Sequence, residues 1–220
     1  MADCGLPTSM TTVSSVTESL FQRGSQYQQF RPTYPPSLFQ WLSNQSAGHQ
    51  LALDLGCGSG QASRGLEPWF RQVLGADISH EQLLAAPASR SHYLLSMANR
   101  LPLADASLDL ITVAQAYHWF DQAAFHAEAQ RTLCPGGMLA LISYGVCEVT
   151  GLGSMIQDFH DGPLAPWWPP ERAQVVAGYP DADLPWPALT YPGDSITLDW
   201  SATDMLGYLD TWSALVQAAR

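Results

Sequence analysis

The segment Leu51-Ala52-Leu53-Asp54-Leu55-Gly56-Cys57-Gly58-Ser59-Gly60 decides the fold. Its first half is a short apolar run interrupted only by Asp54, which is typical of a buried strand. Its second half has glycine at every other position, and glycine lets a backbone turn approach a ligand without a Cβ atom in the way. A strand that leads into such a turn indicates a ligand site at the carboxyl edge of a parallel sheet.

From this segment to residue 144, short apolar runs alternate with stretches of helical character, which is typical of βα units around a parallel sheet. We expect strands over 51–55, 72–77, 92–95, 108–113 and 137–143. Helices are expected over 61–70, after Ser79 with Gln82 three residues on, and from Asp121 to Leu133. The sequence therefore predicts an α/β fold: a Rossmann-like, doubly wound, mainly parallel sheet with helices on both faces.

The segments on either side of this core have a different composition. Tyr27, Phe30 and Tyr34 recur with helical spacing and Pro35-Pro36 opens a second helix, so we expect an N-terminal helical arm. Residues 163–192 hold eight of the sixteen prolines, too many for a central sheet. We expect three parts: a flexible tail over 1–24, the core with its arm over 25–149, and a cap with the truncated C-terminal part of the same domain over 150–220. The cap is expected to be irregular over its Pro-rich residues 163–192.

The chain has twenty acidic and nine basic residues, a net charge of −11, and every basic residue is an arginine. A surface that follows nucleic-acid phosphates needs clustered positive charge, so we do not expect a nucleic-acid partner. No apolar run is long enough to span a bilayer, and the N-terminus lacks the features of a signal peptide. The four cysteines lack CxxC spacing, which favours free thiols. We expect a cytoplasmic monomer or weak homodimer without a membrane partner.

The glycine-rich segment resembles the first motif of class I S-adenosylmethionine-dependent methyltransferases. Asp54 separates it from dinucleotide-binding turns, because a carboxylate there would repel a pyrophosphate. S-adenosylmethionine has no phosphate and carries an ammonium group, which Asp54 would approach. The resemblance implies a cofactor site that includes Gly56, Cys57, Gly58 and Gly60, with the side chain of Cys57 used for packing.

Later segments resemble further motifs of this class, in order. Gly75-Ala76-Asp77-Ile78-Ser79 resembles the second motif, in which the acidic residue accepts hydrogen bonds from both ribose hydroxyls. The resemblance thus assigns Asp77 to the ribose, a role that suits two carboxylate oxygens, and Ile78 to the adenine face. Met97 stands where many members have an aspartate for the adenine amino group, so we expect backbone groups around Ala98 to contact adenine instead.

Residues 27–35 and 115–121 together resemble the trans-aconitate methyltransferase-like group of small-molecule methyltransferases. This resemblance implies a small-molecule methyl acceptor, and it places Tyr27 and Gln115 in the cofactor site. The group normally continues into a final pair of strands, whereas this sequence ends at Arg220 within a predicted helix. We therefore expect that strand pair to be missing.

The candidate catalytic residue is His118, which follows the fourth predicted strand, where methyl group and acceptor should meet. Imidazole suits proton removal near neutrality, but an aromatic run such as 117–120 also commonly forms a pocket wall, and both roles stay open. Arg31 has three interpretations: it binds the cofactor's carboxylate, it binds an acidic acceptor in bidentate fashion, or it forms a structural ion pair. Trp167, Trp168 and Trp186 are candidates to roof the acceptor site. His118, His126 and Cys134 lack the spacing of a zinc site, and we expect no metal.

The combined prediction is an enzyme that transfers a methyl group from S-adenosylmethionine to a small molecule, on a carboxylate or hydroxyl oxygen, and releases S-adenosylhomocysteine. A carboxylate acceptor needs no base and would suit Arg31, whereas a hydroxyl would need His118 or a water held there. The first alternative is a non-catalytic protein that binds S-adenosylmethionine. The second is a dinucleotide-dependent oxidoreductase, but Gln61 stands where its fingerprint requires glycine.

Overall fold

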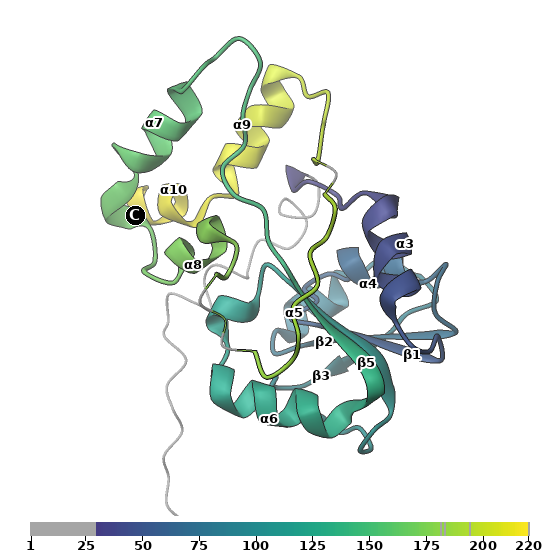
Figure 1. The fold of residues 1–220 in the computed structure, drawn as a ribbon. Coiled ribbons are helices and arrows are strands. Elements are labelled where there is room, and N and C mark those ends of the chain that lie inside the picture. The colour runs from purple at the N-terminus through teal and green to yellow at the C-terminus, as the bar shows by residue number, and fades with distance from the viewer. Residues whose placement is uncertain (1–29, 181, 183, 194, 220) are drawn as a thin grey trace, which may run out of the picture.

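The computed structural model describes residues 30–180, 182, 184–193 and 195–219. Its centre is a five-stranded, all-parallel sheet with the strand order β3-β2-β1-β4-β5 (Figure 1). The strands are β1 (Leu51–Leu55), β2 (Gln72–Asp77), β3 (His92–Leu95), β4 (Leu108–Ala114) and β5 (Leu133–Ile142). From β1 the chain adds β2 and β3 on one side, and it then crosses back to add β4 and β5 on the other side. This order confirms the doubly wound topology. The strand order reverses between β1 and β4, the point where such sheets bind ligands.

The predicted bounds of the first three strands are confirmed. The last strand begins at Leu133, four residues before the predicted Gly137, and the expected helix C-terminus at Leu133 is therefore one residue too long. The reason is tertiary: Leu133 pairs with Leu108 before a register shift, so the following Pro-Gly-Gly turn becomes an irregularity inside the strand.

Helices cover both faces of the sheet, as predicted. On one face, α3 (Pro36–Gln45) and α4 (Gln61–Leu66) bury their apolar residues against Ala52 of β1. On the other face, α6 (Gln122–Thr132) packs against Leu53 and Leu55 of the same strand. Neighbouring residues of β1 thus pack against the helices on opposite faces of the sheet, as the two-residue period of a strand requires.

Local sequence sets where these helices begin and end. Pro36 occupies the first turn of α3, where its missing N–H costs nothing. The side chain of Asp121 caps α6, and Ser79 caps α5 (His80–Leu84) by accepting from the Gln82 amide at 3.3 Å. The helix predicted over 61–70 ends at Leu66, because the next residues turn and bond back to its carbonyl.

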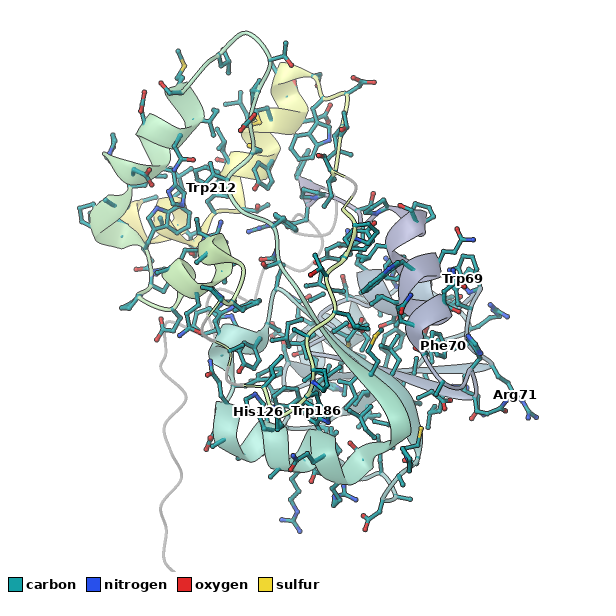
Figure 2. All side chains as sticks on the ribbon, viewed as in Figure 1. Trp69, Phe70, Arg71, His126, Trp186 and Trp212 are labelled. Atoms are coloured by element: carbon teal, nitrogen blue, oxygen red, sulfur yellow. The ribbon has the colours of Figure 1, made fainter. Side chains whose placement is uncertain are left out.

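The residues after β5 form a cap with its own small core beyond the carboxyl ends of β4 and β5 (Figure 1). Its helices are α7 (Met155–Asp161), η2 (Ala165–Trp167), α8 (Arg172–Ala177), α9 (Ala202–Asp210) and α10 (Ser213–Ala218). Trp212 is buried inside this unit, as Figure 2 shows. Within the Pro-rich residues 163–192, only η2 and α8 are regular among the described residues, so the irregular character predicted for this stretch agrees with the structure. Residues 184–193 and 195–200 have no regular structure, and the longer helices α7 and α9 lie outside the Pro-rich stretch.

One edge of the sheet remains open. β5 pairs with β4 alone, and the described residues add no strand on its other side. A groove of about 2090 Å³ runs along this edge, lined by β5, by α3 and by the irregular segment that precedes α9. The groove lies apart from the glycine turn, none of whose residues line it.

Candidate functional site

The glycine turn after β1 is folded against β2 and against the end of β4. Gly56, Gly58 and Gly60 have φ angles of +69°, +53° and +76°, a region that residues with a Cβ atom avoid. The amide of Gly56 donates to the carbonyl of Ala76 at 2.7 Å, which ties the turn to β2. A Cβ atom on Gly56 would lie 2.5 Å from the Cβ atom of Ala116, so this close approach requires glycine.

The same turn leaves part of its backbone open to a ligand. Gly56 and Gly58 are partly exposed, whereas Cys57 and Gly60 are buried. A Cβ atom built on Gly58 would meet no atom closer than 3.7 Å, so its backbone borders free space. Burial raises the pKa of the Cys57 thiol, which stays protonated and packs in the interior, as predicted for its side chain.

Asp77, at the end of β2, lies directly beside the turn. Its Oδ2 accepts from the Gly58 amide and its Oδ1 accepts from the Ser79 amide, both at 2.8 Å. Burial raises the pKa of this carboxyl, and the two amide hydrogen bonds oppose the shift. Each oxygen keeps a lone pair, so the carboxylate is still able to accept from two ribose hydroxyls.

An apolar surface lies next to Asp77, at the carboxyl ends of β2 and β3. Ile78 follows β2 and is 53% exposed, and Met97 follows β3 and is 61% exposed. Ala98 is partly buried against the core. The exposed side chains of Ile78 and Met97 suit a flat apolar ring such as adenine, and the contacts predicted for Ile78, Met97 and Ala98 with it stay predictions.

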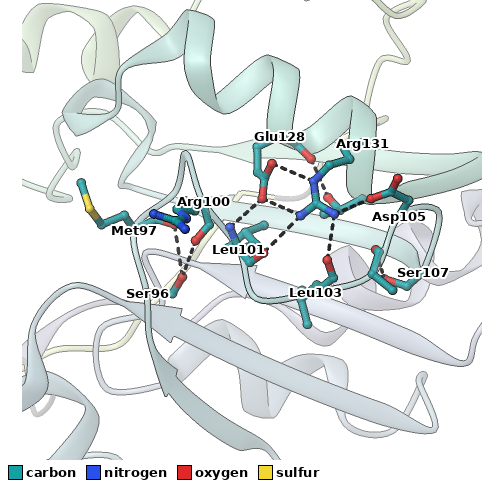
Figure 3. Close-up of polar contacts among 11 residues, drawn as sticks. Ser96, Met97, Arg100, Leu101, Leu103, Asp105, Ser107, Glu128 and Arg131 are labelled. Atoms are coloured by element: carbon teal, nitrogen blue, oxygen red, sulfur yellow. Dashed lines mark hydrogen bonds and ion pairs between the residues drawn. The ribbon is translucent and has the colours of Figure 1, made fainter.

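The loop after Ala98 is held in place from α6 (Figure 3). Arg131 donates to the carbonyls of Leu101 and Leu103 at 3.1 and 2.8 Å. Its guanidinium also pairs with Glu128 at 2.7 Å, and Glu128 accepts from the amide of Leu101 at 2.6 Å. One arginine thus fixes the loop that connects the predicted adenine contacts to β4.

Asp54 lies in the interior rather than on the open side of the turn. It is 0% exposed, and its two oxygens accept from the hydroxyls of Ser63 at 2.7 Å and Thr112 at 3.2 Å. Burial raises the pKa of this carboxyl to about 6, although the hydroxyl hydrogen bonds act against the shift. The sequence did not predict these two partners. The contact between Asp54 and the cofactor's ammonium group stays a prediction.

The chain leaves β4 through a residue in the left-handed region. Gln115 has φ of +57°, which is uncommon for a residue other than glycine, and its amide donates to the carbonyl of Ile142 at 2.8 Å. Its side chain donates to the carbonyl of Tyr144 at 3.4 Å. Gln115 therefore lies at the carboxyl edge, where its predicted contact with the cofactor is untested, and the chain continues into η1 (Tyr117–Trp119).

His118, in η1, is paired with a residue of the cap. Its Nδ1 lies 3.1 Å from the hydroxyl of Tyr179, which follows α8 and is itself 7% exposed. Burial, with a smaller effect from the nearby Arg172 guanidinium, lowers the pKa of His118 to about 4. The imidazole is therefore neutral at pH 7. Its neighbour Tyr117 makes a separate hydrogen bond, with Nε2 of His126 at 3.0 Å.

Arg31 connects the N-terminal arm to the cap. Its Nη2 donates to the carbonyl of Thr211 at 3.0 Å and its Nη1 donates to the hydroxyl of Tyr144 at 3.4 Å. The guanidinium also lies 5.6 Å from the ring centroid of Tyr208. These contacts give Arg31 a structural role, and its predicted binding of a carboxylate stays a prediction. Tyr27 lies outside the described residues.

Two residues of the site were missed from the sequence, Tyr179 and Arg172. They stand in a Pro-rich segment without a motif, and no local pattern there indicates a contact with His118. Trp168 was expected in the roof of the site but packs inside the cap, where its ring centroid lies 4.5 Å from His160 and 5.4 Å from Trp212. Within the described ranges, no group of three or more His, Cys, Asp or Glu residues could hold a metal ion, and no helix is long and apolar enough to cross a membrane.

The carboxyl edge of this sheet thus fits a nucleoside cofactor without a phosphate. Gly58 offers open backbone, Asp77 offers two acceptor oxygens, and Ile78 and Met97 offer apolar surface. Among the described residues, Gly58, Asp77, Ile78 and Met97 supply no positive charge for a pyrophosphate, and the fully buried Asp54 underlies the turn. Fold and site together define the class of Rossmann-like proteins that bind S-adenosylmethionine.

Comparison with known proteins agrees with this class. Residues 53–141 match the family model described as a methyltransferase domain. A relative from Dictyostelium discoideum, named as a methyltransferase, is 34% identical over 193 residues, which cover 85% of this chain and 73% of the relative. A solved structure from Anaeromyxobacter dehalogenans, assigned as a type II methyltransferase, is 39% identical with a TM-score of 0.79, over 86% of this chain and 81% of that one. The chain belongs to the class I S-adenosylmethionine-dependent methyltransferases.

Other relatives share a smaller part of their length with this chain. The malonyl-[acyl-carrier protein] O-methyltransferase of Dechloromonas aromatica is 38% identical over 113 residues, which cover 50% of this chain and 42% of that protein. The chain spans about half the length of its relatives from Mycobacterium, at 48%. These matches cover about half of this chain.

Proposed function

We propose that this methyltransferase acts on an oxygen, carboxylate or hydroxyl, of a small-molecule acceptor that binds between the carboxyl end of β4 and the cap. The observation that carries this proposal is the close approach of Gly56 to Ala116, where an added Cβ atom would lie 2.5 Å from the alanine Cβ atom. The glycine turn therefore lies against the segment that presents His118 two residues later. A cofactor on the turn and an acceptor beside His118 would be neighbours, as methyl transfer requires.

The chain's own residues bind, orient and exclude water. The backbone of Gly56 and Gly58, the carboxylate of Asp77 and the side chain of Ile78 would hold the cofactor. When bound, the cofactor supplies a sulfonium methyl group that passes to the acceptor oxygen while the carbon–sulfur bond breaks and its electron pair stays on sulfur. The end of α8 packs on η1 through Tyr179, which keeps water from this side of the site.

One relative and one motif resemblance support an oxygen as the acceptor atom. The relative from Dechloromonas aromatica is an O-methyltransferase by name, and it matches half of this chain. Residues 27–35 and 115–121 resemble the trans-aconitate methyltransferase-like group, which favours a small acid. We therefore rank carboxylic acids before alcohols and phenols as acceptors.

Calorimetric titration with S-adenosylmethionine, S-adenosylhomocysteine and NADH tests the cofactor site first. We expect saturable binding of both sulfur nucleosides and none of NADH. Binding of NADH without the sulfur nucleosides would show a dinucleotide-dependent oxidoreductase instead. A screen of small acids, alcohols and phenols, read by release of S-adenosylhomocysteine, then tests the reaction. A chain that binds the cofactor and methylates nothing in the screen would favour the non-catalytic alternative.

A further inference from the structure

The side chain of His118 is fixed on one side by the cap. Tyr179 ends the turn after α8 with φ of +57°, and it packs edge-on against Tyr117 at 5.2 Å between ring centroids. Its hydroxyl lies 3.1 Å from Nδ1 of His118, and the two rings are nearly parallel, at 22°. A residue of the cap, distant in sequence, therefore contacts one specific nitrogen of the imidazole.

The hydroxyl proton of Tyr179 needs an acceptor. Tyr179 belongs to the buried core, and burial raises the pKa of its phenol, so the proton is retained. The only acceptor that the described residues offer this hydroxyl is Nδ1 of His118. If Nδ1 carried a proton and donated instead, the phenolic O–H would be buried without an acceptor, which is unfavourable. The contact therefore favours donation from the Tyr179 hydroxyl to an unprotonated Nδ1.

The charges around the ring also disfavour an imidazolium. Arg172 from α8 acts on His118 electrostatically, and with burial it lowers the pKa of the imidazole to about 4. Among the described residues, the other titratable groups of this cluster are Tyr179 from the cap, Tyr117 on the same element, and His126 from α6, which faces Tyr117. None of these is an anion at pH 7 that could stabilise a protonated ring. A base of such low pKa removes a proton poorly at neutral pH.

We propose that Tyr179 is a positioning residue that holds His118 in the Nε2–H tautomer, so that His118 orients the methyl acceptor by donating a hydrogen bond and does not act as a base. Nε2 lies across the ring from Tyr179, no described residue bonds it, and His118 keeps part of its surface exposed. The matching acceptor is a group that is already ionised when it binds, a carboxylate. This inference rests on the proposed function, because it places the acceptor beside His118.

Nitrogen NMR of the imidazole rings tests the tautomer without cofactor or acceptor. The full chain, with its six histidines labelled with ¹⁵N, is compared with the His118→Gln variant to identify the His118 signals. We expect an unprotonated Nδ1 and a protonated Nε2 at pH 7, without titration down to about pH 5. In Tyr179→Phe we expect a mixture of the two tautomers, because the donor that holds Nδ1 unprotonated is gone. A protonated Nδ1 in the unaltered chain would overturn the proposal.

The matched control is Tyr117→Phe, which removes the other tyrosine hydroxyl of this cluster. Tyr117 contacts the Tyr179 ring, but its hydroxyl bonds His126. This variant should change the His126 signals and leave the tautomer of His118 intact. If both variants alter His118 equally, Tyr179 has only a general packing role and the proposal is wrong.

Once an acceptor is found, the pH profile separates the two roles of His118. If His118 is a donor, the plot of kcat/KM against pH shows no break between about pH 5.5 and 7.5 whose position differs between the unaltered chain and Tyr179→Phe. A break in that range that moves with the variant identifies a base and overturns the proposal. The NMR result stands even if the chain binds no S-adenosylmethionine, so failure of the proposed function and failure of this inference are distinguishable.

Discussion

The carboxylate of Asp77 joins the glycine turn to β2 and leaves two lone pairs for a ligand. We predict that Asp77→Ala weakens the binding of S-adenosylmethionine by about 1–3 kcal/mol, the cost of losing charge-assisted hydrogen bonds. Calorimetry measures the change in affinity. Asp121→Ala is the matched control, because it also removes a carboxylate that accepts from a backbone amide, at the start of α6. Unchanged affinity in Asp77→Ala, or an equal loss in Asp121→Ala, would show that the ribose assignment is wrong.

Asp54 makes the stability of the fold depend on pH. In the folded chain its carboxyl keeps a proton up to about pH 6, whereas in the unfolded chain it loses it near pH 3.8. The folded state therefore binds more protons between these values, and the contribution of Asp54 to stability falls as the pH rises from about 4 to 6. An asparagine at this position does not titrate and avoids this loss.

We predict that the free energy of unfolding of Asp54→Asn rises relative to that of the unaltered chain by about 3 kcal/mol between pH 4 and pH 7. The size follows from a shift of roughly two pH units at about 1.4 kcal/mol each. Denaturant unfolding of both chains at several pH values measures it. Curves that stay parallel over the whole range would mean that the Asp54 carboxyl is ionised at its ordinary pKa.

At the scale of elements, α6 controls the loop that carries the predicted adenine contacts. Arg131→Met keeps the apolar stem but removes the hydrogen bonds to Leu101 and Leu103. We predict faster amide exchange over residues 97–107 and several-fold weaker cofactor binding, with the sheet unchanged. Hydrogen exchange read by mass spectrometry locates the effect.

The control for this variant is Arg71→Met, which removes an exposed guanidinium whose hydrogen bond to Gln50 is long, at 3.4 Å. It should leave the loop as protected as in the unaltered chain. If the loop exchanges at the same rate in Arg131→Met and in Arg71→Met, the arginine network does not hold the loop.

Elements set by nearby residues could be predicted from the sequence, and those set by distant contacts could not. The strand 51–55, its glycine turn and Asp77 at the end of β2 follow from patterns within a few residues. The start of β5 at Leu133 depends on pairing with Leu108, which no local pattern shows. The hydrogen bond of Thr112 to Asp54 and the contact of Tyr179 with His118 likewise join residues far apart in the chain.

For the whole molecule, the net charge of −11 is spread over a small domain and opposes its compact state. Salt screens this repulsion, so we predict that the melting temperature rises as sodium chloride increases from low to physiological concentration at constant pH. Differential scanning calorimetry measures the change, and potassium chloride serves as the control for an effect of one particular ion. A fall in melting temperature would mean that the arginine ion pairs outweigh the excess of carboxylates.

The aromatic core of the cap also gives the molecule an optical signal of its own. Trp212 is 1% exposed and packs against Trp168 and His160, far from the sheet. Fluorescence from these indoles is therefore blue-shifted while the aromatic core of the cap is packed, and it shifts to longer wavelength when water reaches them. Circular dichroism in the far ultraviolet follows the helices and the sheet together, so a red shift that precedes its loss would show water reaching buried indoles while the regular structure persists.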